Sequence, residues 1–234
     1  MTLYALLVDL RHFVATALLA FVALLPIVDP LGGAPIFIAM TAGIAADARV
    51  RMARAVALNS FLLLLASALT GAYVLAFFGL SVPAVQVAGG IVICSIAWSL
   101  LSSATMPGAL AREGQPPPSP DALSQRAFYP LTMPLTVGPG AIAVSLTLGA
   151  SPTSGLLPLV TTALAHVLGI AVVATAVYLC YRFADRIVRR LGPTGTAVVV
   201  RLSAFILLCI GVQICWNGIH AFITGAAQVR NFVG

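Results

Sequence analysis

The chain has 234 residues, of which 61% are hydrophobic and 8% are charged, and this composition excludes an ordinary soluble protein. Its formal net charge is +6. Every basic residue is an arginine and most lie between apolar segments, so the charge indicates orientation in a lipid bilayer and excludes nucleic acid as the expected partner.

We predict an all-α polytopic membrane protein, because a span needs about 20 apolar residues and the chain has room for about six. The expected spans are residues 12–44, 55–79, 82–103, 127–150, 156–181 and 196–223. Proline and glycine interrupt the first and fourth spans, and we expect each to be a discontinuous helix. The first apolar segment is retained as a span, because Asp9 precedes it and no signal-peptide cleavage site follows it.

The first break reads VDPLGGAP at residues 28–35. Proline lacks an N–H group and glycine lacks a Cβ atom, so this break leaves backbone groups unpaired at membrane depth, where only a cavity or a protein interior tolerates them. One helix over the whole first span would be about 50 Å long, against a hydrocarbon core of about 30 Å. We expect two half-helices that meet near the middle of the bilayer, with Pro30, Gly32 and Gly33 at their junction.

Asp29, at this break, is the only acidic residue within an expected span. Aspartate before a proline at the first helical position is a strong N-cap signal, so one interpretation is that Asp29 only caps the second half-helix. A carboxylate is costly at membrane depth and is usually kept for a task. The other interpretation is that Asp29 also takes up a coupling proton or meets the ammonium group of a substrate.

The second break reads PLTMPLTVGPG and ends at Gly140. No acidic residue caps the helix that follows, so backbone N–H groups around Gly138, Pro139 and Gly140 would point into the cavity and suit a carboxylate. Thr132 and Thr136 would add hydroxyl groups. The alternative is an ordinary proline kink packed against neighbouring helices.

Paired interrupted segments in two halves of a chain are typical of the central site of a transporter. A carboxylate at one break and bare amides at the other would suit a zwitterion, which predicts a small amino acid as the substrate.

Two further polar residues are candidates for coupling or gating. Arg201, near the start of the sixth span, either snorkels to the headgroups or acts as a gate or counter-ion for Asp29. His166, in the fifth span, makes an interhelical hydrogen bond or relays protons. Four amides in or near the spans are expected mainly to hold helices together: Asn59, Gln86, Gln213 and Asn217.

A proline-rich cytoplasmic linker at residues 112–126 divides the chain into halves at residues 1–111 and 127–234, with three spans each. Because three is odd, the halves must have opposite orientations, which predicts an inverted repeat. Aligning the third span of each half places Cys94 beside Cys209.

The arginines predict which side each loop faces. Nine of them lie in the loops after the first, third and fifth spans: Arg49, Arg51, Arg54, Arg112, Arg126, Arg182, Arg186, Arg189 and Arg190. Only Arg11 and Arg230 lie on the opposite side. Positive charge favours the cytoplasm, so we expect these loops to be cytoplasmic and both termini to be periplasmic.

The sequence contains no familiar catalytic motif, no nucleotide-binding loop and no residue pattern at metal-ligand spacing. We therefore expect neither an enzyme nor a cofactor, and any pumping should be driven by an ion gradient. The four cysteines lie in apolar spans and are expected to be packing residues.

Three segments resemble the MarC family of bacterial inner-membrane proteins: LLPIVDPLGGAPIFIAMT at 24–41, PLTMPLTVGPGAIAVSLTLGA at 130–150, and VVVRLSAFILLCIGVQICWNGI in the sixth span. The resemblance implies six spans, the bacterial inner membrane and kinship with the LysE-type exporter superfamily. Some members, of the SnatA type, transport small neutral amino acids such as glycine and alanine. The family pattern often has asparagine in place of Asp29, so a role that needs a negative charge there would not extend to the whole family.

We therefore predict a secondary transporter of small neutral amino acids or similar solutes. It would work by alternating access around the two broken helices, coupled to a proton or sodium cation, and a homo-oligomer is left open. The alternatives are an uncoupled channel and a non-transporting accessory membrane protein.

Overall fold

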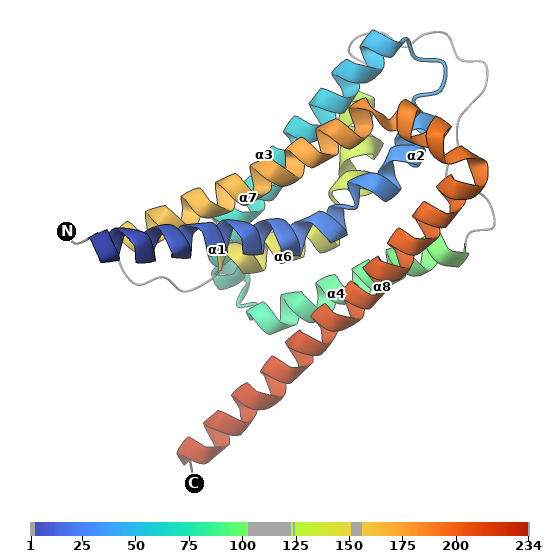
Figure 1. Cartoon of the computed structure of the whole chain (residues 1–234). Coiled ribbons are helices and arrows are strands. Elements are labelled where there is room, and N and C mark those ends of the chain that lie inside the picture. The colour runs from blue at the N-terminus through green and yellow to red at the C-terminus, as the bar shows by residue number, and fades with distance from the viewer. Residues whose placement is uncertain (1–2, 103–122, 124, 151–155, 234) are drawn as a thin grey trace.

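The structure is a computed structural model, and it describes residues 3–102, 123, 125–150 and 156–233 (Figure 1). Within these ranges the chain is almost entirely helical and contains no β-strand, which confirms the predicted all-α class. The predicted linker at residues 112–126 lies outside the described residues, apart from 123, 125 and 126. The elements, in chain order, are α1 (Leu3–Val28), α2 (Pro30–Met40), α3 (Ala46–Phe78), α4 (Val82–Ser102), η1 (Ala127–Thr136), α6 (Pro139–Gly149), α7 (Leu156–Arg182) and α8 (Ala184–Val233).

Five of the helices are long and apolar enough to cross a membrane. The bent pair formed by η1 and α6 supplies a sixth span if it is counted as one. The described chain therefore agrees with the six predicted spans. α3 begins at Ala46, before the expected start at residue 55, because alanine and arginine favour the helix and carry it beyond the apolar stretch.

The first broken segment consists of two unequal helices. α1 has 26 residues and α2 has 11, so the break does not divide the segment in the middle. At 1.5 Å per residue α1 is about 39 Å long and α2 about 17 Å. α1 alone is long enough to cross the hydrocarbon core, and α2 is a short helix that follows it.

The second broken segment starts with irregular backbone. Tyr129 and Met133 have extended dihedral angles inside η1, each just before a proline, because the ring of a following proline disfavours the helical conformation. α6 then begins at Pro139, and its axis is bent by 71° from that of η1.

α8 also contains a break, near its start. Gly192 has a φ of 66°, in the left-handed region that glycine adopts without strain, and Pro193 follows it. The turns before Gly192 carry the ion pair between Arg189 and Asp185. The expected sixth span therefore corresponds to the part of α8 that follows this break.

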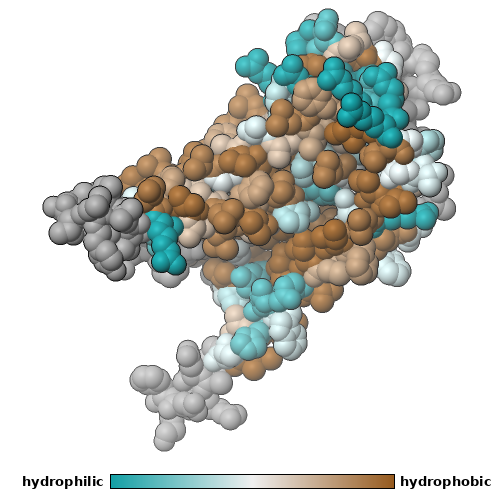
Figure 2. Space-filling model, viewed as in Figure 1, coloured by the Kyte–Doolittle hydropathy of each residue, from teal (hydrophilic) through white to brown (hydrophobic). Residues whose placement is uncertain are grey.

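Arginines gather at one end of the molecule, where Arg49, Arg182, Arg186 and Arg189 line a common surface depression. We call this the arginine-rich end. Figure 2 shows hydrophilic side chains concentrated there, at the upper right, and a mostly hydrophobic surface along the helices below. The start of α1 and the end of α8 both lie away from it (Figure 1). This is the surface expected of a protein whose sides face lipid.

α4 packs against α8 more extensively than any other two elements do. The contact depends on small residues, because a Cβ atom at Gly90 would lie 2.5 Å from Cys215 Sγ and one at Gly211 would lie 2.7 Å from Cys94 Sγ. Small residues let helix backbones approach closely, which is the usual basis of helix association in lipid.

Candidate functional site

Asp29 joins the two helices of the first broken segment. Its backbone lies in the left-handed region (φ 42°, ψ 62°), which aspartate and asparagine adopt more readily than most residues. Its N–H donates to the Leu25 carbonyl at 3.0 Å, and its own carbonyl accepts from the Gly33 N–H at 2.9 Å. Its carboxylate accepts from the Gly32 N–H at 3.0 Å and caps α2. One residue therefore ends α1 and starts α2.

The Asp29 carboxylate retains capacity for a ligand. Besides the bond from Gly32, the carboxylate has only the hydroxyl of Ser203 on α8 near it as a further donor among the described residues. A carboxylate offers about four acceptor sites. Asp29 is half-buried, and among the described residues it takes part in no ion pair. Its remaining acceptor sites are therefore available to a ligand cation or donor.

α6 starts without a side-chain cap. Gly138 occupies the N-cap position with extended backbone, Pro139 follows at the first helical position, and the Gly138 carbonyl accepts from Ile142 N–H at 3.1 Å. The N–H groups of Gly140 and Ala141 precede the first intrahelical bonds and so have no partner within the helix. They present the positive end of the α6 dipole. The two breaks therefore differ in polarity.

The two breaks line one cavity of about 360 Å³, which we call the break cavity. Asp29, Gly32 and Gly33 line it from the first break, and Gly138 and Gly140 from the second. Its other walls are apolar: Ile27, Val28, Ile36, Met40, Ile93, Ile96, Leu100, Pro130, Pro134, Leu135, Ala141, Val200 and Leu207. Its volume is at the small end of ligand-binding cavities, about 300–1,000 Å³. It therefore has the size and polarity to hold a small solute with both a positive and a negative group.

Two glycines of the break cavity are required by their neighbours. A methyl group at Gly33 would lie 2.6 Å from the hydroxyl oxygen of Tyr181 on α7. A methyl group at Gly140 would overlap the Ile93 side chain on α4. Both broken segments are thus packed tightly against the long helices, which fixes their backbone N–H groups at the cavity.

The predicted hydroxyl groups of the second break are bonded within the protein. Thr132 donates to the Ala127 carbonyl at 2.7 Å, and Thr136 donates to the Leu131 carbonyl at 2.7 Å. The Thr136 hydroxyl also lies 2.9 Å from that of Tyr181. Both threonines are buried and neither lines the break cavity. In this arrangement they support η1 and do not face a ligand.

The other predicted site residues lie outside the lining. Pro30 is buried and Pro139 is exposed, and each starts a helix without lining the break cavity. Arg201 is exposed on α8, directly after the lining residue Val200. His166 is buried and lines a separate cavity of about 90 Å³ beside α3.

Sequence reasoning missed the apolar walls and the supporting residues of the site. Ile93, Ile96 and Leu100 lie three and four residues apart and so share one face of α4. Every face of α4 is apolar, so the sequence does not distinguish the face that lines a cavity. Tyr181 and Ser203 carried no local signal, because they meet the breaks only in the folded chain.

Comparisons with known proteins agree on one family. The sequence model of the family described as "MarC family integral membrane protein" matches residues 14–223. A UPF0056 membrane protein of Archaeoglobus fulgidus is 29% identical over 211 residues, which cover 90% of this chain and 95% of that protein. A UPF0056 membrane protein of Methanocaldococcus jannaschii is 31% identical over 213 residues, which cover 91% of this chain and 98% of that protein. The UPF0056 inner membrane protein MarC of Salmonella typhimurium is 29% identical over 217 residues, which cover 88% of this chain and 94% of that protein. No solved structure matches the chain significantly.

Proposed function

Because the chain belongs to the MarC family of integral membrane proteins, we propose that it is a secondary transporter of small neutral amino acids. Family membership explains the apolar composition and the spans. The substrate and the mechanism are inferred from the cavity between the two breaks.

One observation carries the proposal: two broken helices of opposite polarity line the same small cavity. The Asp29 carboxylate would accept from the ammonium group of an amino acid, and the N–H groups of Gly140 and Ala141 would donate to its carboxylate. The apolar walls leave room for a small side chain and offer no partner to a charged one. A zwitterion such as glycine or alanine satisfies both ends at once.

A paired set of helix contacts supports an inverted repeat. α2 packs on α8 and α7, and its counterpart α6 packs on α4 and α3. α1 packs on α7, and its counterpart η1 packs on α3. Each of these six contacts has a counterpart when the elements of one half are exchanged with those of the other. In such folds, one half can rock against the other around the shared site, which opens it to each side of the membrane in turn.

The contact between α4 and α8 indicates the register of this repeat. The Cys94 Sγ lies 3.8 Å from the Leu208 carbonyl oxygen, and the Cys215 Sγ lies 3.5 Å from that of Val87. In each contact, a cysteine of one half faces a backbone carbonyl of the other half, so exchanging the halves converts one contact into the other. They support a register that pairs Cys94 with Cys215, whereas the sequence alignment suggests Cys209 as its partner.

We place the protein in the inner membrane, because the Salmonella relative carries that location in its name. Positive charge favours the cytoplasmic side, so the arginine-rich end would be cytoplasmic and the two chain ends periplasmic. Asp29 would also bind the coupling cation, a proton or sodium, since it is the only carboxylate within the spans that the sequence predicts. Arg201 remains a candidate gate at the cytoplasmic mouth, whereas the separate position of His166 leaves it outside the proposed path.

Counterflow in proteoliposomes tests this function. We expect labelled glycine and alanine to accumulate by exchange, with saturation and with rates that differ between two pH values. Asp29→Asn should reduce exchange at least tenfold, whereas Asp47→Asn, an exposed acid at the start of α3, should not change it. Linear uptake without exchange would favour a channel. Absence of both flux and an amino-acid-dependent thermal shift would favour an accessory protein.

A further inference from the structure

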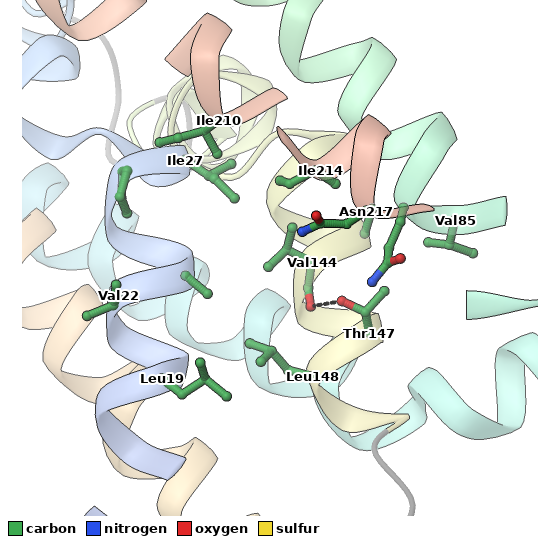
Figure 3. Close-up of a pocket in the computed structure, with 14 residues that line it drawn as sticks. Leu19, Val22, Ile27, Val85, Val144, Thr147, Leu148, Ile210, Ile214 and Asn217 are labelled. Atoms are coloured by element: carbon green, nitrogen blue, oxygen red, sulfur yellow. Dashed lines mark hydrogen bonds between the residues drawn. The ribbon is translucent and has the colours of Figure 1, made fainter. Parts of the chain in front are cut away.

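A second cavity, of about 380 Å³, is lined by parts of both broken segments (Figure 3). From α1 it is lined by Leu19 and Val22, which precede the first break, and from α6 by Val144 and Thr147, which follow the second. The break cavity uses the opposite parts of the same segments, α2 and η1. The two cavities therefore extend in opposite directions, the break cavity toward the arginine-rich end and the second cavity away from it.

The proposed repeat exchanges the two cavities. In the register that pairs Cys94 with Cys215, three residues that line the break cavity have counterparts that line the second cavity. Ile93 corresponds to Ile214, Ile96 to Asn217, and Leu207 to Gln86. A transport path with inverted symmetry needs such a pair of related openings, one on each side of the membrane.

Ile27 lines both cavities. Its side chain packs against the cluster that contains Ile93 and Leu207. We call these three residues the apolar septum. Ile27 therefore belongs to the wall that the two cavities share, and Ile93 and Leu207 support it from the break cavity.

The exchange also reveals a chemical difference between the cavities. Ile96 and Leu207 in the break cavity are apolar, whereas their counterparts Asn217 and Gln86 carry amides. Figure 3 shows the Asn217 side chain reaching from α8 toward Val144 on α6.

These amides do not join helices. The carbonyl oxygen of Asn217 accepts from the Gln213 amide at 2.9 Å, and both residues are on α8. Within the described ranges, the NH₂ group of Asn217 and the side chain of Gln86 have no hydrogen-bond partner in the protein. Asn217 is exposed and Gln86 is half-buried, so the unpaired donors of both amides are open to water or to a polar solute in the cavity.

We propose that the second cavity is the outer vestibule of the transport path. In it, the amide N–H groups of Gln86 and Asn217 bind the carboxylate of a small neutral amino acid before the solute passes the apolar septum. The inference rests on the proposed function and adds a second binding site to it. Uncharged donors make this site weaker than the one between the breaks, which suits a site of entry and release.

Thiol labelling tests the vestibule without reference to any substrate. The background has the four native cysteines replaced by alanine. In it, Thr147→Cys reports on the second cavity and Leu100→Cys reports on the break cavity. A membrane-impermeant cationic methanethiosulfonate should modify Thr147→Cys on intact cells and Leu100→Cys on inside-out vesicles. Val85→Cys gives a second position in the second cavity. Modification of both second-cavity positions from the wrong side, or from neither side, would overturn the vestibule.

Kinetics of alanine uptake test the amides. Gln86→Leu and Asn217→Leu together should raise the apparent KM about tenfold, because two hydrogen bonds to the carboxylate are lost, with little change in maximal rate. Asn59→Leu, an amide on α3 that lines neither cavity, is the matched control. An unchanged KM in the double variant would overturn the binding site.

Failure of the proposed function has a different signature. The parent protein would then transport neither glycine nor alanine, while labelling would still decide whether the vestibule exists. The amide site would in that case be judged by protection, since millimolar alanine should slow modification of Thr147→Cys. Protection that is absent, or that persists in the double variant, would overturn it.

Discussion

The hydroxyl groups of Thr136 and Tyr181 lie 2.9 Å apart and join the second broken segment to α7. The Tyr181 ring also stacks on Phe37 of α2, with ring centroids 4.6 Å apart. Its hydroxyl faces the Cα of Gly33 at the first break. One fully buried tyrosine therefore contacts both broken segments, although it does not line the cavity between them.

Tyr181→Phe should destabilise the protein by about 1 kcal/mol, the usual worth of a buried hydrogen bond. The stack on Phe37 is retained, and the Thr136 hydroxyl keeps its bond to the backbone. Thermal denaturation in detergent measures the effect. Tyr178→Phe is the control, because its hydroxyl is paired with Arg182 at an exposed site and its loss should cost less than about 0.5 kcal/mol. Equal melting temperatures for the two variants would contradict the role of Tyr181.

Gly33→Ala should cost about 1–3 kcal/mol, because its methyl group would meet the Tyr181 hydroxyl oxygen at 2.6 Å. Without that oxygen, the nearest atoms are ring carbons at 3.4 Å, which is an ordinary contact. In the Tyr181→Phe background the same substitution should therefore cost less, with a coupling of about 1 kcal/mol in a double-mutant cycle. Strict additivity of the two changes would show that the contact is absent.

Asp29→Asn and Asp29→Ala should separate capping from charge. Asparagine accepts the left-handed backbone and can still cap α2, so the stability of Asp29→Asn should be close to that of the parent. Alanine loses the cap and is strained at this φ, for a combined cost of about 2–3 kcal/mol. Thermal denaturation compares them. If Asp29→Asn melts as low as Asp29→Ala, the carboxylate stabilises the fold by more than capping.

Gly90→Ala and Gly211→Ala should each destabilise the protein by about 1–3 kcal/mol, since each added methyl would meet backbone atoms of the partner helix that cannot turn away. Similar costs are expected because the two positions are counterparts in the proposed repeat. Ala88→Val, on the exposed face of α4, is the control. Detergent melting curves give the comparison, and a large cost at one glycine with none at the other would argue against the repeat.

The sequence indicated those parts of the site that local backbone chemistry determines. Proline and glycine mark the two breaks whatever surrounds them, and an aspartate before Pro30 signals a cap by itself. The spans follow from apolar length alone. The family resemblance rested on the same segments and is confirmed by the match over residues 14–223.

The remaining features depend on packing between distant segments. Tyr181 and Ile27 look like ordinary residues of apolar helices, and only the fold places one against both breaks and the other between two cavities. The proposed register, which pairs Cys94 with Cys215, rests on the contacts between α4 and α8, and identities within an apolar helix do not determine it. The amides Gln86 and Asn217 suggested contacts between helices, but among the described residues neither makes a hydrogen bond to another helix.

Ile27→Ala should join the two cavities, because Ile27 lines both of them and packs against Ile93 and Leu207 in the septum. We expect labelled glycine to leak from proteoliposomes without an exchange partner or an ion gradient, at a rate well above that of the parent. Ile38→Ala removes the same atoms from a half-buried position on α2 that lines neither cavity, and it should not leak. Ile27→Phe should have the opposite effect and slow exchange, since a larger side chain thickens the barrier. Leak from both alanine variants would point to general loosening of the fold, whereas leak from Ile27→Ala alone would place the barrier at the septum.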